Sequence, residues 1–156
     1  MEPFFHTLES TGLGAAVRQS LWLFPIIECF HLLALALLGG TVLAVDMRLL
    51  GVGLQAQPKA ELARRLYPWM VGALVAAVTT GFVMFLSEAI KCYFSPPFWY
   101  KMSFLLVATV FAFTARRRVV MAEPGRFAPG LEKLTAAVSL VLWFGVGFSG
   151  RWIAFY

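Results

Sequence analysis

Two residues that could do chemistry interrupt the first long apolar stretch of the chain. Glu28 and His31 are the only ionisable side chains between Leu21 and Val45. Residues three apart are neighbours on a helix, so the carboxylate and the imidazole are predicted to lie side by side. Along a helix starting at Leu21, Glu28 lies roughly 10 Å and His31 roughly 15 Å from the start. If this helix crosses a membrane, such groups are costly and mark a functional candidate.

Two basic residues are predicted to lie on the same side of the membrane as this pair. Lys101 stands near the start of the third apolar stretch, and Arg151 closes the fourth. Both therefore fall at the level where the first stretch begins. We predict a polar site in the outer half of the protein, built around Glu28, His31, Lys101 and Arg151.

The first stretch also carries Asp46, eighteen residues after Glu28. Eighteen residues are five helical turns, so Asp46 is predicted to return to the same face near the other end of the helix. Gly39 falls on this stripe, and a small residue there favours close approach of a neighbouring helix. The stripe is therefore predicted to face protein rather than lipid.

His31 could serve as an iron ligand, because neutral imidazole binds haem iron and helical bundles commonly hold such cofactors. Lys101 and Arg151 would then suit the propionates. The only other histidine, His6, precedes the first apolar stretch. A second ligand would have to be His6 folding back, a methionine such as Met84, or an open position.

Other roles for the polar residues stay open. His31 could instead hydrogen-bond to Glu28 or to a neighbouring helix and so hold the bundle together. Glu28 and His31 together could also form a proton relay or part of a small transporter. The sequence shows no Ser-His-Asp arrangement and no paired carboxylates, so no catalytic residue is assigned and the protein is not expected to be an enzyme.

The elements that position these residues are predicted from hydropathy. Hydrophobic residues make up 60% of the chain and charged residues only 13%, whereas soluble domains carry about 25% charged residues. About 20 apolar residues suffice to cross a membrane as a helix. The predicted fold is all-α: a transmembrane four-helix bundle over 21–156 with an N-terminal interfacial helix within 1–20. The predicted spans are 21–45, 67–90, 98–116 and 133–155.

The basic residues predict the orientation of these spans, because cytoplasmic loops are enriched in lysine and arginine. The first and third connections share a side and carry nine of the thirteen basic residues, Arg116–Arg118 among them as an anchor ending the third span. The side with nine is predicted to be cytoplasmic, with both termini periplasmic. This distribution accounts for the net charge of +5, so no nucleic-acid partner is expected. Cys29 and Cys92 form no metal-binding spacing and are predicted to be free thiols.

Several motifs resemble an uncharacterised family of bacterial four-helix integral membrane proteins, a domain of unknown function. The longest is WLFPIIECFHLLALALLGGTVLAVDMRLLG at 22–51, and shorter ones are ARRLYPW at 63–69, FWYKM at 98–102 and GRWIA at 150–154. That family is more distantly similar to copper-resistance D and bacterial protoporphyrinogen-oxidase-type proteins. The resemblance implies haem b on a first-span histidine with a lysine opening the third span, here His31 and Lys101. Many relatives end that span with Phe-His, where this chain has Phe113-Thr114.

Taken together, the sequence predicts a small protein of the bacterial inner membrane. It is expected to be a structural or accessory subunit of a membrane assembly, or a homo-oligomer, whose partners are the lipid bilayer and other membrane proteins. A haem-b redox protein using His31 is the first alternative, and a small transporter or proton relay is the second.

Overall fold

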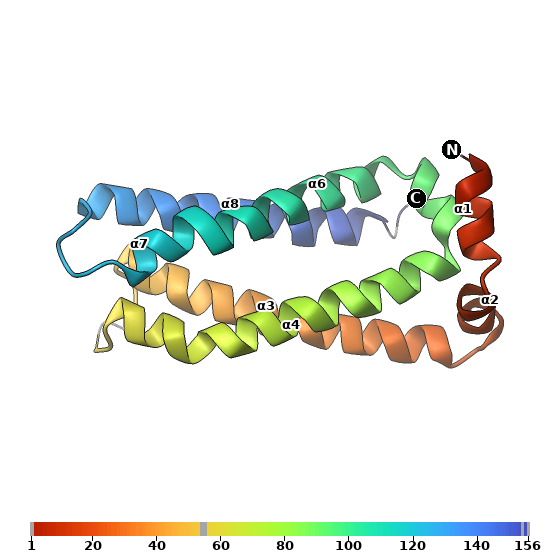
Figure 1. The fold of residues 1–156 in the computed structure, drawn as a ribbon, viewed down its shortest axis with the longest axis horizontal. Coiled ribbons are helices and arrows are strands. Elements are labelled where there is room, and N and C mark those ends of the chain that lie inside the picture. The colour runs from red at the N-terminus through yellow and green to blue at the C-terminus, as the bar shows by residue number, and fades with distance from the viewer. Residues whose placement is uncertain (1, 54–55, 154, 156) are drawn as a thin grey trace.

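The protein is four long helices with three short ones at one end (Figure 1). The computed structural model describes residues 2–53, 56–153 and 155. The third span is continuous through α6, η1 and α7. The elements are α1 (Glu2–Glu9), α2 (Gly12–Gln19), α3 (Leu23–Leu50), α4 (Lys59–Ser87), α5 (Ala89–Phe94), α6 (Pro96–Phe111), the π-helical turn η1 (Ala112–Arg116), α7 (Arg117–Met121) and α8 (Pro129–Ile153).

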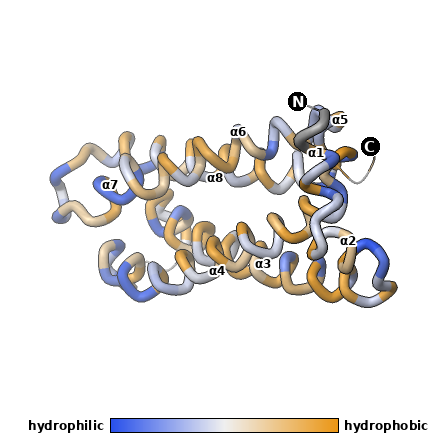
Figure 2. Tube along the Cα trace, turned by 45° about the vertical axis from the view of Figure 1, so that its right-hand side comes forward, coloured by the Kyte–Doolittle hydropathy of each residue, from blue (hydrophilic) through white to orange (hydrophobic). Residues whose placement is uncertain are grey.

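Each of the four long helices is long and apolar enough to cross a membrane, with lengths of 28, 29, 26 and 25 residues. Apolar side chains cover their outward surfaces as well as their contacts, and hydrophobic segments run along all four helices in Figure 2. A bilayer can accept such a surface because it replaces water as the solvent of the helix exteriors. The predicted all-α membrane bundle is confirmed. α4 begins at Lys59, earlier than the predicted span, and accommodates Pro68 within it.

The long helices form two pairs, and a contact between one helix of each pair joins them. α3 packs along α4, α8 packs along α6, and α3 also contacts α8. α4 meets the third span mainly through α7, at the end of the bundle where the connections after α3 and after α7 lie. We call this the basic end, because the first and third connections carry nine of the thirteen basic residues. The two clusters of buried apolar residues lie at the basic end and in the middle of the bundle.

The N-terminal segment is docked across the opposite end of the bundle, which we call the N-terminal end (Figure 1). The predicted single interfacial helix is two short helices, α1 and α2. Glu9 Oε2 accepts a hydrogen bond from the backbone N–H of Ile90 at 3.0 Å. The Phe5 ring is buried, and its centroid lies 4.7 Å from the centroid of the Tyr93 ring. A Cβ on Gly14 would lie 2.5 Å from a backbone oxygen of α4, so only glycine allows this close approach.

Candidate functional site

His31 links α3 to α4 in the interior of the bundle. Its Nδ1 lies 2.9 Å from the hydroxyl of Thr80, which in turn donates to the carbonyl of Ala76 at 2.7 Å. The imidazole therefore donates through Nδ1 and Thr80 accepts. A Cβ on Gly81 would lie 3.0 Å from His31 Cε1, so the ring packs against the backbone of α4. This arrangement agrees with the expectation that His31 bonds to a neighbouring helix.

Glu28 lies on the outer surface of α3, away from His31's contacts. The buried positions of α3 run from Asp46 and Leu38 back to His31, and the half-buried Ile27 and Phe24 continue that line. Within this chain the stripe therefore does not face the rest of the bundle at Glu28. Gly39 is also exposed with no neighbouring atom within 4 Å of its Cβ position, so no helix of this chain approaches it closely.

Lys101 and Arg151 point to different surroundings. Lys101 is partly buried and packs on α8, where its Nζ would lie 3.5 Å from a Cβ placed on Gly150. Its ammonium is near enough to His31 to act on it electrostatically. Arg151 is exposed and stacks over the ring of Phe155 at 5.5 Å. Of the four residues in the predicted polar site, the structure brings only His31 and Lys101 into the interior.

The contacts of His31 in the described residues give no support to a bound haem group. Thr80 is bonded to Nδ1, which by itself would leave Nε2 for a ligand. The imidazole ring lies against α4 at Gly81, where a Cβ would be 3.9 Å from Nε2. His6 is exposed on α1, and the described residues contain no cluster of three or more His, Cys, Asp or Glu that could hold a metal ion. His31 thus has a protein partner, and its contacts account for its burial.

Both cysteines are free thiols, as predicted. Cys29 is exposed on α3, next to Glu28, whereas Cys92 is buried in α5. Burial and, less strongly, the nearby Glu88 carboxylate raise the pKa of Cys92 to about 11. Of the two thiols, only Cys29 lies on the surface of the chain.

The second polar site is an ion pair buried near the basic end. Arg116 Nε donates to Asp46 Oδ1 at 2.7 Å, and Arg116 Nη2 donates to the carbonyl of Val42 at 3.2 Å. Asp46 is 0% exposed and Arg116 only 5%. The prediction that Arg116 belongs to the anchor that ends the third span is wrong, because its side chain is buried. Arg116 joins the third span to the first, while Arg117 and Arg118 stay exposed.

The π-helical turn explains how one arginine of three turns inward. Ala108, Ala112, Arg116 and Val120 are all buried, at a constant spacing of four residues. In a regular α-helix each step of four residues drifts by about 40°, so the line would leave the interior within three steps. The wider turn at 112–116 reduces this drift and holds Arg116 on the buried line. Such turns are frequent at functional sites.

One oxygen of the buried carboxylate lacks a hydrogen bond. Asp46 Oδ2 and Ser139 Oγ are both buried without a hydrogen-bond partner in the described part of the chain. Ser139 comes from α8 and is adjacent to the carboxylate. Three spans therefore contribute polar groups to this site. One feature of the sequence could have indicated the ion pair, because Asp46 and Arg116 carry opposite charges at matching depths of different spans.

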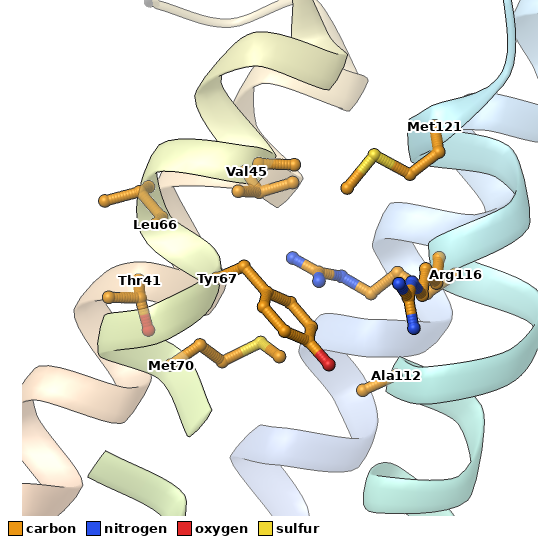
Figure 3. Close-up of a pocket in the computed structure, with 10 residues that line it drawn as sticks. Thr41, Val45, Leu66, Tyr67, Met70, Ala112, Arg116 and Met121 are labelled. Atoms are coloured by element: carbon orange, nitrogen blue, oxygen red, sulfur yellow. The ribbon is translucent and has the colours of Figure 1, made fainter. Parts of the chain in front are cut away.

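A cavity of about 30 Å³ lies beside the ion pair, between α3, α4 and the third span (Figure 3). Its polar lining consists of Thr41, Tyr67, Arg116 and Arg117. A cavity of this size holds a water molecule. The guanidinium of Arg117 lies 5.3 Å over the ring of Tyr67, which fixes a cation at the cavity wall. Two arginines thus converge on one small space.

Comparison with known proteins assigns the chain to a family. The model of a family of unknown function (DUF6644) matches residues 6–156. The chain belongs to this family. No curated protein and no solved structure matches it.

Proposed function

We propose that this chain is a non-enzymatic membrane protein that works as a homo-oligomer, with a second copy packed on the exposed face of α3. The observation that carries the proposal is the position of Glu28. It is an ionisable residue on the outward surface of a membrane-spanning helix. Residues of this kind almost always face protein or a water-filled cavity when they lie within a span.

The surroundings of Glu28 are apolar in both directions along α3. Towards the N-terminal end, Leu21 is 87% exposed and Trp22 is 76% exposed. Towards the middle of the helix, Leu33 is 66% exposed. Glu28 therefore lies within the apolar band, not beyond it. A protein surface that covers Glu28 would remove its contact with lipid.

The exposed surface of α3 also has room for a close neighbour further along the helix. Ala36 and Gly40 are exposed and four residues apart, a spacing that lets two membrane helices approach closely. No atom lies within 4 Å of the Cβ position of Gly40. An open groove of about 370 Å³ lies between α3 and α4 on the other side of α3 from Glu28, and Leu33 and Gly72 are among the residues that line it. Side chains of a second copy could fill this groove.

Cellular placement is part of the proposal. We place the chain in a bacterial inner membrane with the basic end in the cytoplasm and both termini in the periplasm. The concentration of lysine and arginine at one end supports this orientation. α1 and the end of α8 lie together at the other end (Figure 1), as an even number of crossings requires.

Cys29 provides the test, because it is exposed one residue from Glu28 while Cys92 is buried. Membranes containing the native chain are treated with copper phenanthroline, which oxidises two neighbouring thiols to a disulfide. We expect a disulfide-linked dimer on a non-reducing gel for the native chain and for Cys92→Ser. Cys29→Ser should give none.

A matched pair of glycine variants separates specific packing from random collision. Gly40→Leu should reduce the cross-linked fraction severalfold, because the side chain would keep a second helix away. Gly147→Leu, at an open position on α8, should leave it unchanged. Equal cross-linking in both variants, or a native chain that stays monomeric at every expression level, would refute the proposed interface.

The more distant similarity to copper-resistance D and protoporphyrinogen-oxidase-type proteins remains a hypothesis. The contacts of His31 with Thr80 and Gly81 give it no support. The relay hypothesis is also weakened, because the structure pairs His31 with Thr80 and leaves Glu28 on the surface.

A further inference from the structure

We propose that the cavity beside the Asp46–Arg116 pair receives one phosphate oxygen of an anionic phospholipid, whose phosphodiester group lies at the Arg117 side of the cavity. The site lies between α3, α4 and the third span, towards the basic end. It is distinct from the proposed α3 interface, because α3 lines the cavity with its buried residues Thr41 and Val45 and not with its exposed surface (Figure 3).

The charges around the cavity favour an anion. Arg116 and Arg117 both line it, and the single carboxylate in contact with them, Asp46, is bonded to Arg116. Two cations and one anion leave one positive charge. A phosphodiester carries one negative charge and would balance it. Arginine is especially suited to this role because its planar group presents several donors to phosphate oxygens.

Two acids of the helices at the basic end are engaged by other basic residues. Glu61 pairs with Arg65, and Glu132 pairs with Lys59. Within the described part of the chain no carboxylate pairs with Arg117, whose guanidinium instead rests on the Tyr67 ring. Stacking on Tyr67 holds this cation beside the cavity without neutralising it.

Arg116 offers a further donor from the interior. Its Nε and Nη2 are bonded to Asp46 and to the carbonyl of Val42. Its third nitrogen, Nη1, takes part in neither bond and can donate to an oxygen in the cavity. A buried, fixed donor and an exposed, stacked cation would then contact the same phosphate.

The place of the cavity favours a lipid over a free ion. α4 contacts the third span mainly through α7, so the two helices are less closely packed towards the middle of the membrane. Apolar residues, Met70 and Met121 among them, line the rest of the cavity. A headgroup at the cavity could therefore leave its acyl chains along the surface between α4 and α6, in contact with apolar side chains.

The test measures lipid binding by the full chain in a neutral detergent. Native mass spectrometry counts bound phosphatidylglycerol and phosphatidylcholine at increasing lipid concentration. We expect phosphatidylglycerol to bind more tightly than phosphatidylcholine. Arg117→Gln should weaken phosphatidylglycerol binding about tenfold, the loss expected for a charge-assisted hydrogen bond.

Arg118→Gln is the matched control, because it removes the same charge from the next residue, which is exposed and does not line the cavity. This variant should bind phosphatidylglycerol as the native chain does. An equal loss in both variants would overturn the proposal, because it would show a diffuse surface attraction. Displacement of the lipid by millimolar inorganic phosphate would also overturn it, in favour of a free-anion site.

Discussion

The Asp46–Arg116 pair can be tested by removing each partner and then both. Asp46→Leu leaves a buried guanidinium without its carboxylate, and Arg116→Met leaves a buried carboxylate without its guanidinium. The double variant replaces both charges by apolar side chains of similar size. The two residues join α3 to the third span through two hydrogen bonds, so their loss should affect the whole bundle.

The expected size of these effects follows from the burial of the pair. With Asp46 at 0% and Arg116 at 5% exposure, breaking the pair should cost about 3–5 kcal/mol of unfolding free energy. Asp46→Leu should be the more damaging change, because a guanidinium cannot lose its proton in a protein whereas a carboxylate can gain one. The double variant should lose much less than the sum of the single losses, since no uncompensated charge remains.

The assay is unfolding in mixed micelles of dodecyl sulfate and a mild detergent, followed by tryptophan fluorescence. A double-mutant cycle gives the coupling free energy between the two residues. We expect a coupling of about 3 kcal/mol or more. Additive single losses would refute the reasoning, and so would a native-like Asp46→Leu variant, because either result means that the pair is not buried as described.

Two further predictions follow from particular contacts. In a Cys29→Ser background, alkylation of Cys92 by iodoacetamide should stay slow at pH 8 and rise only towards pH 11, because its pKa is raised to about 11 by burial; rapid labelling at pH 8, measured by intact mass, would contradict this. Gly145→Ala should lower the unfolding free energy by about 1–3 kcal/mol, because its Cβ would lie 2.8 Å from the ring of Phe104. Gly147→Ala on the same helix meets no atom within 4 Å and should change the unfolding free energy little, so equal effects of the two substitutions in the same assay would contradict the packing of α6 on α8.

The four spans could be predicted from the sequence because crossing a membrane is a local property of a segment. About 20 apolar residues and a helical backbone satisfy the requirement without reference to any other part of the chain. The free cysteines and the polar N-terminal segment were predictable for similar reasons. The docking of α1 and α2 was not, because it depends on a close approach of Gly14 to α4.

The tertiary structure decided which side chains face inward. α3 is apolar on every side, so its sequence carries no amphipathic signal that distinguishes the surface bearing Glu28 from the surface bearing His31. The packing partners α4 and α8 select the buried line, and that line leaves Glu28 outside.

Arg116 shows most clearly the difference between what the sequence determines and what the tertiary structure decides. The sequence determined that three arginines end the third span, and the usual role of such a run is to lie at the surface. Only the folded bundle places Asp46 at the depth where one of them can pair, and only the π-helical turn keeps that one on the buried line. Sequence thus determined the spans and their charges, while packing between helices decided which charges meet.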